Sequence, residues 1–220
     1  YLRYDETVFV GDHIQSMTGE EAFNWLGSEY TSNASVEGLE NIPKDGKFLI
    51  VSNHPMGAAD AIALYHKIYP VRNDLFFFAN ELFVYLLGAF HELLAPVVWN
   101  KEKETHSANK VTLERLSVFF GDDRPGIIFP SGRLSKLTFL GLWDRPWEKT
   151  PIALAKKYNF PLIPVYVEGR NSWFFYFASY VNKQLRDISQ LNELFNKREK
   201  EMSIKICLLY TSPSPRDVSL

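Results

Sequence analysis

The feature that most constrains the fold of this chain is an apolar run that leads directly into a helical pattern. Residues 47–52 are compact and apolar enough to form a buried strand, and a helical pattern begins near Asp60. Between them, Pro55 and Gly57 bend the chain. A buried strand followed at once by a helix is the repeating unit of α/β folds. The sequence therefore predicts a layered α/β domain.

The same alternation of strand and helix patterns continues along most of the chain. We expect further strands at 36–39, 75–78, 96–99, 126–129, 162–167 and 203–206, and helices at 60–69, 81–94, 107–120, 150–158, 172–181 and 188–199. No internal repeat and no domain boundary is visible. We predict one α/β domain in which helices flank a mostly parallel central sheet.

Three local predictions concern the ends of elements and the face of one helix. Residues 7–10 are expected to form a short strand. Thr18 and Glu21 form a capping-box pattern that should start a short helix ending at Gly27. Within residues 107–120, the apolar side chains that we expect near one buried face are Val111, Leu113, Leu116, Phe119 and Phe120.

Composition excludes several classes of protein. The net charge of −2 gives no reason to expect nucleic acid as a partner. The single cysteine, Cys207, excludes an intramolecular disulfide framework and a cysteine-built metal site, and we predict no bound metal. No run reaches the roughly 18 apolar residues that a membrane-spanning helix requires.

The two ends of the chain suggest a fragment. The chain begins at Tyr1, without an initiator methionine or a signal peptide. From Leu208 onward it is rich in serine and proline, and it resembles translated sequencing-adaptor read-through at the ends of metagenomic reading frames. We therefore predict that residues 207–220 are a non-native, disordered tail.

His54 and Asp60 are the first candidate site. An imidazole near its ordinary pKa is an effective general base at neutral pH, and a carboxylate on its second nitrogen orients it. Because Pro55 and Gly57 bend the chain between them, the carboxylate can reach back to the imidazole. The same pattern also fits a hydrogen-bonded structural histidine beside an aspartate that caps a helix.

The second candidate site follows the strand predicted at 126–129. Gly132 would allow a ligand to approach the backbone, Arg133 offers a planar fork for phosphate or carboxylate, and Ser135 adds a polar group. The alternative is a Pro-Gly turn with a solvated arginine. Since ligands bind beyond the carboxyl ends of the strands in such sheets, we expect this segment to lie near His54.

Together these segments resemble a known family. Asn53-His54-Pro55 with Asp60, then the Phe-Pro-Ser-Gly-Arg-Leu-Ser of residues 129–135, then residues 163–165, resemble the motifs of the glycerolipid acyltransferases. Residues 36–43 resemble the lead-in to the first motif of this family. The resemblance implies a lead-in at residues 1–35 and an acyltransferase domain at residues 36–206.

Two departures from the common family pattern point to one branch. Five residues, not four, separate His54 from Asp60, and Ser131 stands where most members have glutamate. Both features, and the Arg-Asn-Ser of residues 170–172, resemble the hemolysin-like branch, which includes acyltransferases for lyso-ornithine and similar amino-acid lipids. The expected acceptor is therefore the hydroxyl of a lyso-ornithine or other amino-acid lipid, or of a lysophospholipid, and not specifically lysophosphatidic acid.

The resemblance implies a reaction and its partners. An acyl chain would pass from a thioester of acyl-carrier protein or coenzyme A to a lysolipid hydroxyl, with His54 as the general base, Asp60 orienting it, and no bound cofactor. Backbone amides near Gly132 would bind the oxyanion. The residues expected to contact substrate are Asn53, Gly57, Lys101, Ser131, Gly132, Arg133 and Ser135.

Contact with lipid is expected to be peripheral, at the cytoplasmic face of a bacterial inner membrane. Residues 173–177 could enter the membrane interface or form a buried helix face. The side chains expected to line an acyl groove, for which core packing is the alternative, are Leu86, Leu87, Phe90, Leu93 and Leu94. The competing functions are a catalytically silent lipid-binding protein, which the intact His54 and Asp60 argue against, and a thioester or lipid hydrolase. A serine hydrolase is disfavoured because the chain has no Gly-x-Ser-x-Gly motif.

Overall fold

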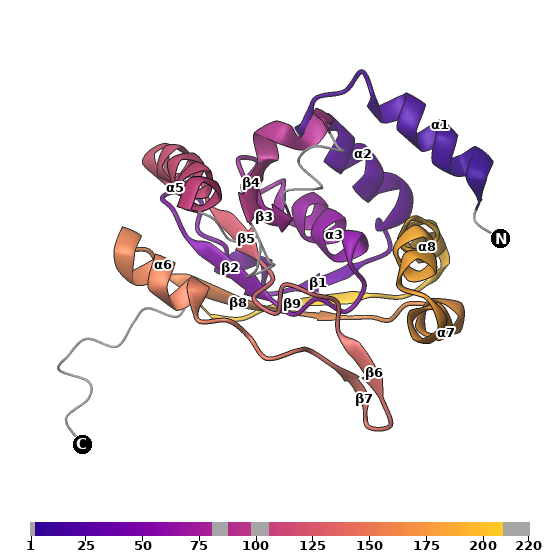
Figure 1. The fold of residues 1–220 in the computed structure, drawn as a ribbon. Coiled ribbons are helices and arrows are strands. Elements are labelled where there is room, and N and C mark those ends of the chain that lie inside the picture. The colour runs from indigo at the N-terminus through magenta and orange to yellow at the C-terminus, as the bar shows by residue number, and fades with distance from the viewer. Residues whose placement is uncertain (1–2, 81–87, 98–105, 209–220) are drawn as a thin grey trace.

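A seven-stranded sheet forms the centre of the computed structural model, which describes residues 3–80, 88–97 and 106–208 (Figure 1). Its strand order is β1-β9-β8-β2-β5-β3-β4, and every neighbouring pair is parallel except β8 and β9. The strands are β1 (Ser35–Glu37), β2 (Leu49–Ser52), β3 (Phe76–Asn80), β4 (Leu94–Val97), β5 (Gly126–Ile128), β8 (Leu162–Glu168) and β9 (Ser203–Ile206). The predicted α/β fold with a mostly parallel sheet is confirmed.

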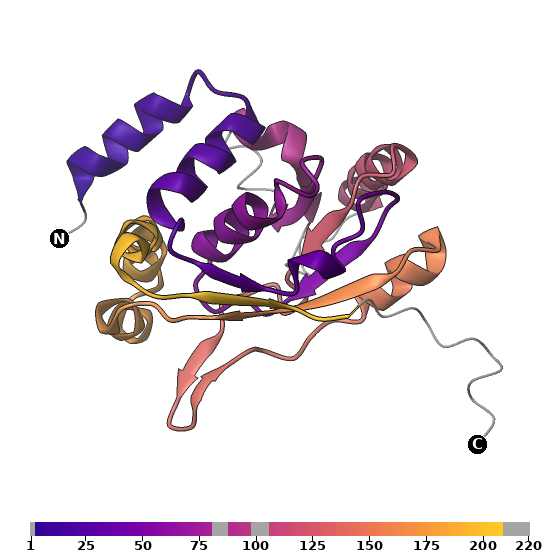
Figure 2. The ribbon, with the colours of Figure 1, turned by 180° about the vertical axis from the view of Figure 1, so that it is seen from behind.

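Helices cover both faces of this sheet (Figures 1 and 2). They are α1 (Tyr4–Ile14), α2 (Gly19–Tyr30), α3 (Ala58–Ile68), α5 (His106–Gly121), α6 (Thr150–Tyr158), α7 (Trp173–Val181) and α8 (Lys183–Phe195). Short 3₁₀ turns occur at Leu39–Asn41, Gly88–Leu93 and Asn196–Glu199. A separate antiparallel hairpin, β6 (Lys136–Thr138) and β7 (Gly141–Trp143), extends from the body of the molecule in both views.

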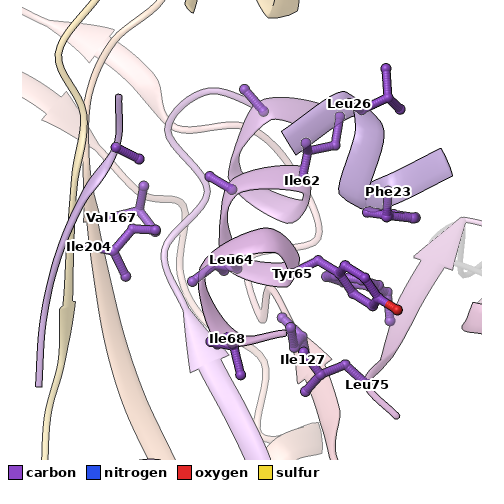
Figure 3. Close-up of a cluster of buried hydrophobic side chains, with 14 of the residues drawn as sticks. Phe23, Leu26, Ile62, Leu64, Tyr65, Ile68, Leu75, Ile127, Val167 and Ile204 are labelled. Carbon is purple, nitrogen blue, oxygen red and sulfur yellow. The ribbon is translucent and has the colours of Figure 1, made fainter. Parts of the chain in front are cut away.

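The core has two parts, one on each face of the sheet. Within β2, Ile50 joins the cluster under α2, α3 and α8, whereas Leu49 and Val51 join the cluster under α5 and α6. Figure 3 shows part of the first cluster, in which Phe23 of α2 packs beside Tyr65 of α3, with ring centroids 5.0 Å apart. Burial on both faces explains why β2 is continuously apolar.

The prediction of a strand at residues 7–10 is wrong, because this segment belongs to α1. Phe9 stacks on His13 one turn later, with ring centroids 5.6 Å apart, and this spacing brings side chains together on a helix. Val10 alone in the run is buried. A run of four residues is too short to distinguish the two-residue period of a strand from the 3.6-residue period of a helix.

The capping box of Thr18 and Glu21 is confirmed, but the helix does not end at Gly27. α2 continues to Tyr30, because Gly27 provides close contact with α3 and does not act as a stop signal. A Cβ atom at position 27 would lie 2.3 Å from the Cβ of His66. The glycine therefore sets the distance between the two helices.

Only part of the face expected on α5 is buried. Phe119 and Phe120 pack around Phe76 of β3, with ring centroids at 4.5 and 5.3 Å, whereas Val111 and Leu113 are exposed one to two turns earlier. Of the helix expected at 81–94, residues 81–87 lie outside the described part of the chain. Residues 88–93 form a 3₁₀ turn, and Leu94 already belongs to β4.

Candidate active site

The end of β2 is fixed to β8 by Asn53. Its side-chain oxygen accepts a hydrogen bond from the Val167 amide at 2.7 Å, and its side-chain nitrogen donates to the Val167 carbonyl at 2.8 Å. Both polar groups of the Asn53 side-chain amide are thus bonded to the neighbouring strand, which gives Asn53 a structural role. Its expected contact with substrate stays a prediction. This clamp fixes the position at which His54 leaves the sheet.

His54 and Asp60 are in direct contact, as their spacing suggested. The Nδ1 atom of His54 lies 2.9 Å from Oδ2 of Asp60, which also accepts the amides of Met56 at 2.9 Å and Gly57 at 3.0 Å. Asp60 is fully buried, whereas the His54 side chain is 19% exposed. Because a carboxylate only accepts hydrogen bonds, the contact assigns the proton to Nδ1 and leaves the lone pair of Nε2 available.

The turn between the two residues requires glycine. Gly57 has a φ of 83°, and a Cβ atom there would lie 3.0 Å from a methyl group of Leu134. The turn places Asp60 in the first turn of α3, where its carboxylate also caps the helix by accepting the Gly57 amide. Helix capping and orientation of His54, which were alternatives in the sequence, are both performed by one carboxylate.

Phe129 holds the other side of the imidazole. Its ring stacks on that of His54 with centroids 4.0 Å apart and an angle of 22° between the planes. The stacked phenylalanine and the Asp60 hydrogen bond together fix the orientation of the ring. This role of Phe129 was not predicted; the only signal was an aromatic residue at the end of a strand, directly before Pro130.

Ser135 connects the second motif to His54. Its amide donates to the His54 carbonyl at 2.9 Å, and its hydroxyl donates to Oδ1 of Asp144 at 2.6 Å. The same Asp144 oxygen accepts the His54 amide at 3.3 Å, and Oδ2 accepts the indole N–H of Trp147 at 2.7 Å. Asp144 therefore joins the two motifs, although the sequence reading missed it. Its signal was only an aspartate three residues before a tryptophan.

Residues 131–133 form a tight turn beside Phe129. The Ser131 hydroxyl donates to the Arg133 carbonyl at 2.8 Å, and the Gly132 amide donates to the Phe129 carbonyl at 2.9 Å. The Gly132 amide, one of the expected oxyanion donors, is thus used by the turn itself. The side chain of Arg133 is exposed and forms no ion pair with any described residue.

The remaining expected binding residues fall into two groups. Lys101 lies outside the described residues, as do Leu86 and Leu87. The remaining members of the expected acyl groove are buried in the core under α2 and α3, namely Phe90, Leu93 and Leu94. Of the aromatic run at 173–177, two side chains are buried, as expected of a buried helix face, and two are exposed on α7. Entry of the exposed side chains into a membrane interface stays a prediction.

A buried polar cluster joins the segment that follows β8 to the end of α8 and the 3₁₀ turn after it. The ammonium group of Lys197 is fully buried and donates to the Arg170 carbonyl at 3.0 Å and to Oδ1 of Asn171 at 2.9 Å. Glu193 lies 3.7 Å from it and accepts the Ser172 amide at 2.7 Å and the Ser172 hydroxyl. Burial lowers the pKa of Lys197 to about 8, and the negative charges of Glu193 and, more weakly, Asp60 oppose this shift. The Arg-Asn-Ser segment is thus held by buried side chains of Glu193 and Lys197, although the Arg170 side chain itself is exposed.

A histidine at the end of a parallel strand, held by a buried aspartate and flanked by a Phe-Pro-small-Gly turn, is the arrangement of the acyltransferase class that the motifs resemble. The chain belongs to this class: the family model described as "Acyltransferase" matches residues 20–205. Within the described ranges, no group of three His, Cys, Asp or Glu side chains could hold a metal ion. In the same part of the chain, no helix combines the length and the apolar character needed to cross a membrane.

Two curated relatives carry the same name. The chain is 30% identical over 182 residues to a lyso-glycine lipid O-acyltransferase of Phocaeicola vulgatus, covering 80% of this chain and 63% of the relative. It is 31% identical over 180 residues to a lyso-glycine lipid O-acyltransferase of Bacteroides thetaiotaomicron, covering 79% of this chain and 64% of the relative. The matched segment thus spans less than two thirds of the length of either relative.

Proposed function

We propose that this protein is an O-acyltransferase that moves a fatty acyl chain from a thioester to the hydroxyl of a lysolipid. The observation that carries this proposal is the hydrogen bond between Nδ1 of His54 and the buried Asp60. It leaves Nε2 of a partly exposed ring as the proton acceptor. The membership in the acyltransferase family and the names of both relatives support the same reaction.

The reaction needs one base and no covalent intermediate. Nε2 of His54 takes the proton from the acceptor hydroxyl while its oxygen attacks the thioester carbonyl. The tetrahedral intermediate then expels the thiolate, which receives the proton from the imidazolium, and the new ester remains on the lipid. Asp60 stabilises the imidazolium, and Phe129 keeps the ring in the plane in which Nε2 faces the substrate.

The turn at residues 131–133 is the proposed binding site for negative charge. Because the Gly132 amide bonds the Phe129 carbonyl, the amides of Ser131 and Arg133 are the proposed oxyanion donors. The exposed guanidinium of Arg133 is proposed to bind an anionic group of the acceptor or the donor. Ser135 and Asp144 act on this site by fixing the backbone around His54.

The proposed acceptor is an amino-acid lysolipid. Both relatives are named for a lyso-glycine lipid, whose free head-group carboxylate is a suitable partner for Arg133. A lyso-ornithine lipid is the related alternative. The proposed donor is an acyl thioester of acyl-carrier protein or coenzyme A, with peripheral binding at the cytoplasmic face of the inner membrane and no bound cofactor.

One assay separates this function from its competitors. Purified protein is incubated with acyl-carrier-protein and coenzyme A thioesters and with lyso-glycine, lyso-ornithine and lysophosphatidic acceptors, beside His54→Ala. His91→Ala, an exposed histidine on a 3₁₀ turn, is the matched control. We expect acylated lipid that disappears only in His54→Ala. Product formed equally by His54→Ala would refute the general base. Free fatty acid alone would indicate a hydrolase, and lipid binding without any product would indicate a catalytically silent protein.

A further inference from the structure

The tip of the β6–β7 hairpin presents apolar side chains to solvent. Phe139 and Leu140 connect the two strands and are 111% and 86% exposed, so they have almost no contact with the rest of the protein. Trp143 on β7 and Trp147 shortly after it are about half exposed. The hairpin extends away from the body of the molecule (Figures 1 and 2). Such exposure is costly for large apolar side chains unless they contact a partner.

Exposed cations occur on this hairpin and on the chain segments that flank it. Four exposed basic side chains lie between residues 131 and 149, and none of them forms an ion pair within the described ranges: Arg133, Lys136, Arg145 and Lys149. The segment contains two acids. Of these, Asp144 is already bonded by Ser135 and Trp147, and only Glu148 is exposed. The hairpin therefore combines an apolar tip with flanking segments of net positive charge.

The base of the hairpin is bonded to the proposed active site. Ser135 directly precedes β6 and Asp144 directly follows β7, and these two residues bond the carbonyl and the amide of His54. Strands of three residues span about 10 Å, so the tip lies only a short distance from the catalytic histidine. Any surface that binds the tip is thus brought next to His54.

We infer that the β6–β7 hairpin docks the protein on a lipid bilayer, with Phe139 and Leu140 inserted into its apolar edge and the basic side chains on anionic head groups. Tryptophan near the level of the head groups and cations beside them match the chemistry of a bilayer interface. A protein partner would require about 800 Å² per side, which is far more than the tip of a two-stranded ribbon provides. This inference rests on the proposed function for the identity of the lipid that reaches His54.

Exposed aromatic side chains also occur on α7. Trp173, Phe177 and Tyr180 of α7 are each more than 60% exposed. In Figure 1, α7 and the hairpin both lie along the lower edge of the molecule, on the side opposite α1 and α2. The hairpin is the element that we test, because its tip has no structural role that a substitution could disturb.

The direct test measures binding to vesicles. Phe139→Asp/Leu140→Asp is compared with the unmodified protein and with Val118→Asp, a matched change at an exposed apolar residue of α5. Co-sedimentation uses phosphatidylcholine vesicles with and without phosphatidylglycerol. We expect the double variant to bind at least roughly 100-fold more weakly, because two large apolar side chains no longer enter the bilayer. Equal binding of the double variant and the unmodified protein would overturn the inference.

Two further measurements test the cations and separate docking from catalysis. Lys136→Ser/Arg145→Ser should reduce the preference for anionic vesicles by about five-fold for each cation removed, and an unchanged preference would overturn the role of these side chains.

On a short-chain lysolipid dissolved as monomers, Phe139→Asp/Leu140→Asp should retain the activity of the unmodified protein. On an acceptor embedded in vesicles its activity should fall. A chain that acylates neither acceptor but still sediments through the hairpin would refute the proposed function and support the docking.

Discussion

The amide of Ser135 donates a hydrogen bond to the carbonyl of His54 at 2.9 Å, and this bond joins the two motifs into one site. It forms because β2 and β5 are parallel neighbours, with Leu49 opposite Gly126, so both strands end at the same edge of the sheet. The Asp144 carboxylate reinforces this connection by accepting the His54 amide and the Ser135 hydroxyl. The backbone of His54 is thereby held on both sides.

Replacing Asp60 by Asn tests the orientation of His54. The neutral amide cannot stabilise an imidazolium as the Asp60 carboxylate does, although its oxygen can still accept the Met56 and Gly57 amides. We expect kcat for acyl transfer to fall by roughly 10²–10⁴. The control is Asp187→Asn, which changes an exposed carboxylate and should leave kcat unchanged. A steady-state assay with one thioester donor measures the effect, and an unaltered kcat in Asp60→Asn would exclude this mechanism.

Replacing Gly57 by Ala tests the turn that places the two residues together. At a φ of 83° with Leu134 only 3.0 Å from the new methyl group, the free energy of unfolding should fall by roughly 1–3 kcal/mol. Gly46→Ala separates the backbone strain of a positive φ from the steric contact with Leu134, because Gly46 has a φ of 74° and no heavy atom near its Cβ position. Gly11→Ala, inside α1 with open space around it, should stabilise the protein by about 0.5–1 kcal/mol. Urea unfolding of the three variants checks the order, and Gly57→Ala as mild as Gly46→Ala would contradict the steric contribution.

Replacing Asp144 by Ala tests the connection between the motifs. The change removes the acceptor of three hydrogen bonds, which come from the His54 amide, the Ser135 hydroxyl and the Trp147 indole. We expect a loss of roughly 1–3 kcal/mol in the free energy of unfolding and a lower kcat, because His54 loses one of its backbone constraints. Asp144→Asn, which keeps acceptor capacity, should recover part of both. If Asp144→Ala lowered stability and left kcat unchanged, Asp144 would be a structural residue only.

The sequence was sufficient to predict the central pair of the site. A histidine after an apolar run, a Pro and a Gly, and an aspartate at the start of a helical pattern all act locally, within one strand-turn-helix unit. The distances between these residues depend on the local turn alone. For the same reason the capping box of Thr18 and Glu21 could be read directly from the chain.

The partners contributed by distant segments could not be predicted in this way. The stacking of Phe129 on His54 depends on the order of strands in the sheet, and the bonds of Asp144 depend on the path of a hairpin that no motif indicated. The role of Gly27 also could not be predicted from its neighbours in the sequence, because a glycine after a helical pattern usually indicates the end of the helix. Its actual role, close contact with His66, is visible only when α2 is packed on α3.

The buried Lys197 predicts a specific dependence of stability on pH. Burial lowers its pKa from 10.5 to about 8, so between these values the unfolded chain holds a proton on this lysine that the folded protein has released. The contribution of Lys197 to the free energy of unfolding therefore rises with pH across this window, by about 3 kcal/mol. Below pH 8 both states are protonated and the contribution is constant.

The matched comparison is between the unmodified protein and Lys197→Met/Glu193→Gln, which leaves no isolated charge in the buried cluster. Urea unfolding across the window from pH 8 to 10.5 should show the stability difference between the two proteins moving in favour of the unmodified protein as pH rises. Lys205→Met, at an exposed lysine of β9, should keep the pH dependence of the unmodified protein. If the free energy of unfolding changed with pH in the same way in the double variant and in the unmodified protein, Lys197 would keep its proton in the folded state. Glu193 and the acceptors on Arg170 and Asn171 would then offset the effect of burial on its pKa completely.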